Sequence, residues 1–123
     1  MNTTNNPQQA NNSDSKNIAI ISYLTPIGWI IAYAMYSSNK SSLAIYHLRQ
    51  TLLLMIVALG IYAIQTTLLF VPHIGWMVTI LSMVLNLSLL VLWVIGLIAA
   101  VNGEEKPIPL VGEKAQQLFI KIN

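Results

Sequence analysis

Residues 50–103 read QTLLLMIVALGIYAIQTTLLFVPHIGWMVTILSMVLNLSLLVLWVIGLIAAVNG and contain no Asp, Glu, Lys or Arg. As one α-helix this run would be about 80 Å long, whereas the hydrocarbon core of a bilayer is about 30 Å thick. The chain must therefore turn within the run, and VPHIG at residues 71–75 supplies residues that favour a turn. Two membrane-spanning helices are predicted, over about residues 43–70 and 76–101.

A third span is predicted before this run. Residues 17–39 lie between Lys16 and Lys40 and are also uncharged. A helix over about residues 18–36 would be about 28 Å long, close to the thickness of the hydrocarbon core. Pro26 lies inside it, so a kink is expected there. The predicted fold class is an all-α integral membrane protein with three transmembrane helices and a short C-terminal amphipathic helix.

The two ends of the chain are polar. Residues 1–16, rich in Asn, Gln, Thr and Ser, predict a disordered polar tail. Residues 17–103 form the predicted transmembrane domain, and residues 104–123 form a cytoplasmic tail. Residues 113–122 place apolar side chains at i, i+3, i+4 and i+7, which predicts an amphipathic helix. We expect this helix to lie on the cytoplasmic leaflet, with docking under the helix bundle as the alternative.

Composition restricts the possible functions. The chain is 55% hydrophobic and 8% charged, whereas a soluble domain carries about a quarter charged residues. Its net charge of +2 comes from scattered basic residues, so the expected partner is the lipid bilayer and not nucleic acid. The absence of cysteine excludes thiol chemistry. Because the predicted spans contain no carboxylate and no catalytic constellation, we expect no enzyme activity, catalytic residue, cofactor or metal site.

The basic residues predict an orientation. With three spans, two basic residues of the first connection and three of the C-terminal tail share one face, and Lys16 lies opposite. The positive-inside rule then places that face and the C-terminus in the cytoplasm and the N-terminus outside.

Small and polar residues follow one face of the last predicted span. They are Thr79, Ser82, Asn86, Trp93, Gly96 and Ala100, spaced by three, four or seven residues. This pattern is typical of a packing seam between membrane helices, and the alternative is the lining of a polar pathway. Asn86 lies near mid-membrane, where its amide needs a hydrogen-bond partner.

Two further candidates lie at the start of the preceding span. His47 and Gln50 are three residues apart and therefore share a helix face. A structural hydrogen-bonding role is the main interpretation of His47, and a proton relay is the alternative. His47 and His73 are separated by a whole span, so the pair does not predict a metal site.

Three stretches together suggest a known family. YHLRQ at residues 46–50 enters an apolar helix, GLIAAVNG at residues 96–103 ends one, and PIPLVG follows at residues 107–112. The combination resembles small bacterial membrane proteins grouped with the chloroplast inner-envelope import component of the TIC translocon, over nearly all of residues 18–122. Its most specific positions are His47, Gln50, Gly103, Pro109 and Gly112.

The resemblance implies an all-helical, multi-pass protein of the bacterial inner membrane. The first functional hypothesis is a non-enzymatic component or scaffold of a membrane assembly, with a role in protein translocation implied by the resemblance. The alternative is a small-solute channel or transporter. It would have to be an oligomer, because three helices enclose little space. The first hypothesis requires a membrane-protein partner, whereas the second requires a homo-oligomer.

Overall fold

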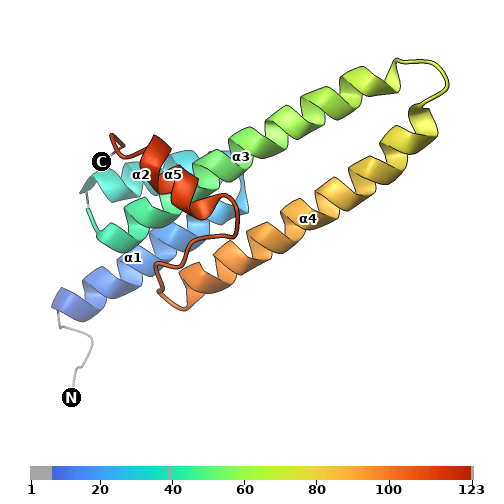
Figure 1. Ribbon diagram of the computed structural model, residues 1–123. Coiled ribbons are helices and arrows are strands. Elements are labelled where there is room, and N and C mark those ends of the chain that lie inside the picture. Colours follow the sequence, from blue (N-terminus) through green and yellow to red (C-terminus); the bar gives the residue numbers. More distant parts are fainter. Residues whose placement is uncertain (1–6, 39, 123) are drawn as a thin grey trace.

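The protein folds into helices only, over the residues that its structure describes. A computed structural model describes residues 7–38 and 40–122 (Figure 1), and this part of the chain contains no β-strand. Its helices are α1 (Pro7–Leu24), α2 (Pro26–Ser38), α3 (Ser42–Leu69), α4 (Gly75–Val101) and α5 (Gly112–Leu118). In Figure 1, α3 and α4 form a long hairpin, and α1, α2 and α5 pack around one end of it. The predicted all-helical class is confirmed.

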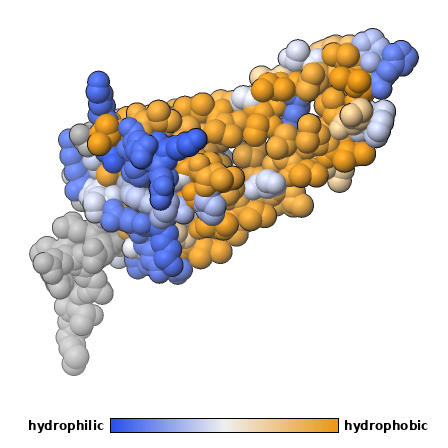
Figure 2. Space-filling view, in the orientation of Figure 1, coloured by the Kyte–Doolittle hydropathy of each residue, from blue (hydrophilic) through white to orange (hydrophobic). Residues whose placement is uncertain are grey.

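The hairpin of α3 and α4 supplies two candidate membrane spans. Both helices are long and apolar enough to cross a bilayer, and little of either is buried inside the protein. Leu59 and Tyr62 on α3 and Met83 and Leu87 on α4 are each more than 60% exposed. Figure 2 shows a hydrophobic surface along this hairpin and hydrophilic surfaces at its two ends. Two of the predicted spans are therefore confirmed as helices that fit a membrane.

The count of three spans is not confirmed, because the chain breaks at Thr25 into two shorter helices. The Thr25 hydroxyl accepts a hydrogen bond of 2.8 Å from the backbone N–H of Gly28. Pro26 occupies the first position of the new helix, where its missing N–H costs nothing. Ile18 of α1 packs with Tyr36 of α2, so α2 runs back along α1. Pro26 begins a helix here, where the sequence predicted a kink.

The polar N-terminal segment is more ordered than predicted. Residues 1–6 lie outside the described part, but α1 already begins at Pro7. Proline suits the first turn of a helix. Further along α1, Ile18 and Ala19 are buried in two different apolar clusters. Because α1 is packed on two sides at this point, tertiary contacts stabilise a helix that composition alone does not favour.

The ends of α3 and α4 follow known capping rules. The Ser41 hydroxyl accepts a hydrogen bond from the backbone N–H of Ala44 and caps the start of α3. At the end of α4, the N–H of Glu104 bonds to Ala99 and the N–H of Gly103 bonds to Ala100. Gly103 has a φ of 70°, which completes a Schellman motif. The predicted helix stop at Gly103 is therefore confirmed, and the chain turns back after it.

The C-terminal helix is shorter than predicted and lies against the bundle. It spans Gly112–Leu118, where the sequence predicted residues 113–122, and it packs on α3. Ala115 is fully buried, whereas Leu118 is 66% exposed. Only part of the predicted apolar face therefore contacts the protein. This placement corresponds to the alternative of docking under the bundle.

Candidate functional site

A buried polar network joins α1, α3 and the segment that follows α4. We call it the polar cage. It consists of the side chains of Tyr23, His47 and Gln50 with the backbone of Glu104 and Ile108. The three side chains are between 0% and 3% exposed. Buried polar groups of this kind require hydrogen-bond partners, and here each one has them.

The hydrogen bonds of the cage fix the tautomer of His47. Its Nε2 lies 2.8 Å from the carbonyl oxygen of Glu104, which can only accept, so Nε2 donates. In the neutral ring Nδ1 is then an acceptor, and it lies 2.9 Å from the hydroxyl of Tyr23. Burial raises the pKa of Tyr23, so the hydroxyl keeps its proton and donates to His47.

Gln50 completes the cage through both ends of its amide. Its Oε1 accepts a hydrogen bond of 2.7 Å from the backbone N–H of Ile108. Its Nε2 donates to the Tyr23 hydroxyl over 3.3 Å. Because the backbone N–H can only donate, the orientation of the amide is determined by its partners. Gln50 thereby connects the start of α3 to both α1 and the segment after α4.

Two glycines allow this close packing. A Cβ at Gly96 would lie 2.6 Å from the Tyr23 ring and 2.7 Å from the Ile108 side chain. A Cβ at Gly112 would overlap Oε1 of Gln50 and lie 2.6 Å from Cα of Pro107. Any larger residue at either position would displace the cage or the loop around it.

A second group of hydrogen bonds holds the end of the chain, and we call it the tail clamp. Arg49 donates to the side chain of Gln116 and to the backbone carbonyls of Ile120 and Ile122, over 3.0 to 3.3 Å. Gln116 in turn donates to the carbonyl of Tyr46 over 2.8 Å. The first two turns of α3 therefore bind the C-terminal segment at several points.

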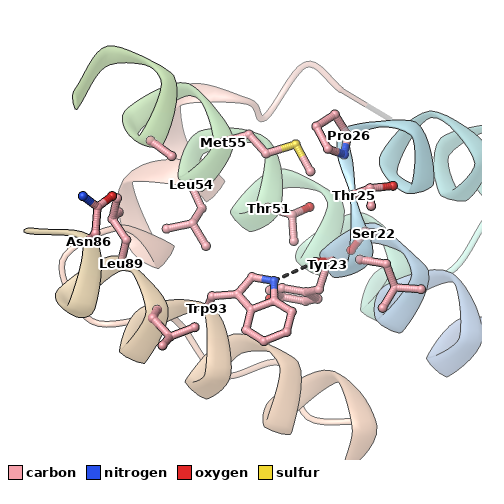
Figure 3. Close-up of a pocket in the computed structure, with 13 residues that line it drawn as sticks. Ser22, Tyr23, Thr25, Pro26, Thr51, Leu54, Met55, Asn86, Leu89 and Trp93 are labelled. Atoms are coloured by element: carbon pink, nitrogen blue, oxygen red, sulfur yellow. Dashed lines mark hydrogen bonds between the residues drawn. The ribbon is translucent and has the colours of Figure 1, made fainter. Parts of the chain in front are cut away.

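Two tryptophans satisfy backbone carbonyls near the cage. The indole N–H of Trp93 on α4 donates to the carbonyl of Tyr23 over 2.6 Å (Figure 3). The indole N–H of Trp29 donates to the carbonyl of Leu48 over 2.9 Å. Tyr23 lies in the last turn of α1, where carbonyls lack partners within the helix. Trp93 thus fixes the end of α1 against α4.

The predicted seam on α4 divides into two parts. Gly96 and Ala100 are buried against the rest of the protein. Thr79 and Asn86 are exposed, and Ser82 is half-buried. Thr79 bonds to the carbonyl of Gly75, and Asn86 bonds to that of Ser82, both within α4. The structure therefore packs only the end of the seam that lies near the polar cage.

Most of the other predicted site residues converge on the cage. His47 and Gln50 are part of it, Gly112 contacts it, and Gly103 forms the turn that leads into it. Pro109 is exposed beside it. The sequence did not predict a role for Tyr23 in this site, nor the pairing of Arg49 with the tail. The hydrogen-bond partners in these pairs lie more than 20 residues apart in the chain, so no local sequence pattern predicts the contacts.

The chemistry of the site is that of a closed network. Its side chains bind mainly backbone groups of residues 104–122. Within residues 7–38 and 40–122, no cluster of three or more His, Cys, Asp or Glu residues could hold a metal ion. The arrangement positions a chain segment, and it fixes the surface that this segment presents.

Residues 14–114 match a family described as the magnetosome magnetite crystal formation protein family. The chain belongs to this family. It is also similar to two UPF0132 membrane proteins of Methanocaldococcus jannaschii. One is 35% identical over 40% of this chain and 33% of the relative. The other is 34% identical over 47% of this chain and 49% of the relative. The matches thus span less than half the length of these curated relatives, and no solved structure matches the chain.

The family membership corrects the resemblance drawn from the sequence. The matches lead to the magnetosome family and to archaeal membrane proteins, and none leads to the TIC translocon. The quoted stretches YHLRQ, GLIAAVNG and PIPLVG do mark one structural site, the polar cage with its flanking turns. The same stretches were wrong as evidence of a relation to protein import.

Proposed function

We propose that this protein is a non-enzymatic membrane scaffold. In this proposal the α3–α4 hairpin anchors it in the bilayer, and the tail clamped on α3 presents a fixed surface to a partner. The observation that carries the proposal is the use of His47, Gln50 and Arg49 to bind backbone atoms of the tail. Side chains used in this way hold a shape, and they are not available for turnover. The family description, magnetite crystal formation, supports a role within a membrane assembly.

A two-span hairpin also changes the proposed topology. The helices α1 and α5 lie at the same end of the hairpin (Figure 1). The six basic residues all belong to segments of that end; they are Lys16, Lys40, Arg49, Lys106, Lys114 and Lys121. The positive-inside rule therefore favours a cytoplasmic location for both ends of the chain. This arrangement replaces the external N-terminus that followed from three spans.

The tail offers a candidate contact surface for the partner. Leu110, Leu118 and Ile120 are 88%, 66% and 63% exposed. They lie near exposed charged residues such as Glu113 and Lys114. Exposed apolar side chains rimmed by polar ones are typical of interaction sites. We propose that these three residues contact the partner.

Site-specific cross-linking in native membranes tests the scaffold role. A photoreactive residue at Leu118 is expected to capture one defined protein, and the same residue at the exposed Ser38 of α2 is the control. Breaking the clamp with Arg49→Gln should abolish capture from position 118. Capture of lipid alone at position 118, or solute flux through liposomes that hold the purified protein, would contradict the proposal.

Cysteine labelling tests the topology separately, because the chain has no cysteine of its own. Single variants Ser13→Cys and Gln117→Cys should resist an impermeant maleimide in intact cells and react after lysis. His73→Cys lies in the turn between α3 and α4 and should react in intact cells. Labelling of Ser13→Cys from outside while Gln117→Cys stays protected would restore the three-span topology.

A further inference from the structure

The outward face of α4 carries a hole of the kind that receives a side chain from another helix. Met83, Asn86, Leu87 and Leu90 are spaced i, i+3, i+4 and i+7, and with Val84 they line an open surface groove of about 460 Å³. Met83, Leu87 and Leu90 are each more than 50% exposed. Four residues at this spacing form the hole of knobs-into-holes packing. No other described helix of the chain fills it.

Asn86 gives this hole an unusual chemical character. The residue is exposed, and one amide N–H bonds to the carbonyl of Ser82 over 2.7 Å. An amide has two N–H donors and a carbonyl acceptor, so one donor and the acceptor have no partner among the described residues. Asn86 lies about 17 Å along α4 from Gly75, near the middle of a bilayer-spanning helix. Lipid offers nothing for these groups to bind there.

We propose that the hole around Asn86 binds the same hole on a second copy of this chain. The partial charges of the amide are complementary to those of an identical amide, so two Asn86 side chains can exchange a pair of hydrogen bonds. Copies inserted in the same orientation have parallel α4 helices related by a two-fold axis, which makes such a contact self-complementary. An Asn at one interfacial position is also the residue that fixes register in parallel helix pairs.

A lipid acyl chain or an unrelated helix would fit the hole around Asn86 less well than a second copy of the chain. A second cavity, of about 350 Å³, lies on the other side of Asn86 between the end of α1, α3 and α4 (Figure 3). A lipid acyl chain would fit its largely apolar walls, but hydrocarbon has no donor or acceptor for the amide. An unrelated apolar helix would leave the amide unpaired as well. The inference requires only that α4 crosses a bilayer, and it does not depend on the scaffold role.

Disulfide trapping of the full chain in native membranes tests the pairing. Met83→Cys lies in the hole, and Leu81→Cys is the matched control. Leu81 is also exposed, but it lies about 180° around the helix from Leu90. Under mild oxidation Met83→Cys should form a dimer, and Leu81→Cys should remain monomeric. Equal trapping at both positions, or none at position 83, overturns the proposal.

The second measurement tests the role of the amide. Adding Asn86→Leu should weaken dimerisation about sevenfold, the value for two membrane hydrogen bonds of average strength. Asn86→Gln keeps the amide and should retain most of the dimer. Because Asn86, among the described residues, bonds only within its own helix, neither variant should change thermal unfolding of the monomer in detergent. Unchanged trapping with Asn86→Leu, or a monomer that carries a bound lipid in native mass spectrometry, would refute the pairing.

Discussion

Replacing Gln50 by Met tests whether the polar cage holds the C-terminal segment. Methionine has nearly the same length and volume, so the packing of this fully buried position is preserved. The change removes the acceptor for the N–H of Ile108 and one donor to the Tyr23 hydroxyl. It leaves the bond between Tyr23 and His47 in place. The variant therefore removes both hydrogen bonds of Gln50, to the segment after α4 and to α1, while those of His47 remain.

The size of the effect of Gln50→Met follows from the backbone N–H of Ile108, which loses its hydrogen-bond acceptor. Ile108 is 1% exposed, and leaving a buried N–H without a partner costs about 1 to 3 kcal/mol. That cost is relieved when the segment detaches and the N–H reaches water. The population of the detached tail should therefore rise about 5- to 150-fold.

Limited proteolysis measures this population directly. When opening is fast relative to cleavage, the rate of cutting follows the fraction of molecules that are open. Trypsin cleavage after Lys114, in α5, should therefore accelerate by the same factor. Gln65→Met is the matched control on the same helix, because the Nε2 of Gln65 is buried and has no hydrogen-bond partner among the described residues. Its cleavage rate should equal that of the unmodified protein. Cleavage of Gln50→Met at the unmodified rate would show that the cage does not hold the tail.

Two glycine substitutions extend the test to the packing around the cage. Gly96→Val should lower stability by about 1 to 3 kcal/mol, because its Cβ meets Tyr23 and Ile108. Thermal unfolding in detergent measures this loss. The control is Gly60→Ala, whose Cβ would lie in open space, and it should be neutral or slightly stabilising. Gly103→Ala should cost about 1 to 2 kcal/mol, because the residue has a φ of 70°. The lysine side chain beside Gly103 can move away, so Gly103→Asn, which tolerates this backbone conformation, should recover part of the loss in the same assay.

Hydropathy predicted α3 and α4 well because their signal is local and long. Each helix is an uninterrupted apolar stretch, and the turn between them contains Pro72. The same criterion failed for residues 18–36, where length and composition also fit a span. The information that decides the case is the pair Thr25-Pro26, a capping residue followed by a residue suited to the first helical position. A proline inside an apolar run also occurs in kinked membrane helices, so the sequence alone left the choice open.

The candidate site was only partly predictable. His47 and Gln50 were found because polar residues are conspicuous at the start of an apolar helix, and Gly103 because it ends one. Tyr23 gave no comparable signal, since a tyrosine in an apolar run looks like any other amphipathic side chain. Its role depends on contacts with residues 24 and 27 positions later. Only the folded chain brings these groups together.

The break at Thr25 also explains why residues 17–39 carry no charge although they do not form one span. The turn between α1 and α2 lies beside Thr51 and Met55 of α3, and Met55 is about 9 Å further along α3 than Arg49. If Arg49 lies at the headgroups, the turn lies within the outer hydrocarbon layer. Backbone groups at that depth must be satisfied internally, and Trp93 and Thr25 supply such bonds at the end of α1 and the start of α2. The exposed Ile27, Ile30 and Ile31 of α2 then face lipid. A helical pair that enters the membrane and returns needs the same apolar composition as a span, which is why hydropathy could not separate the two.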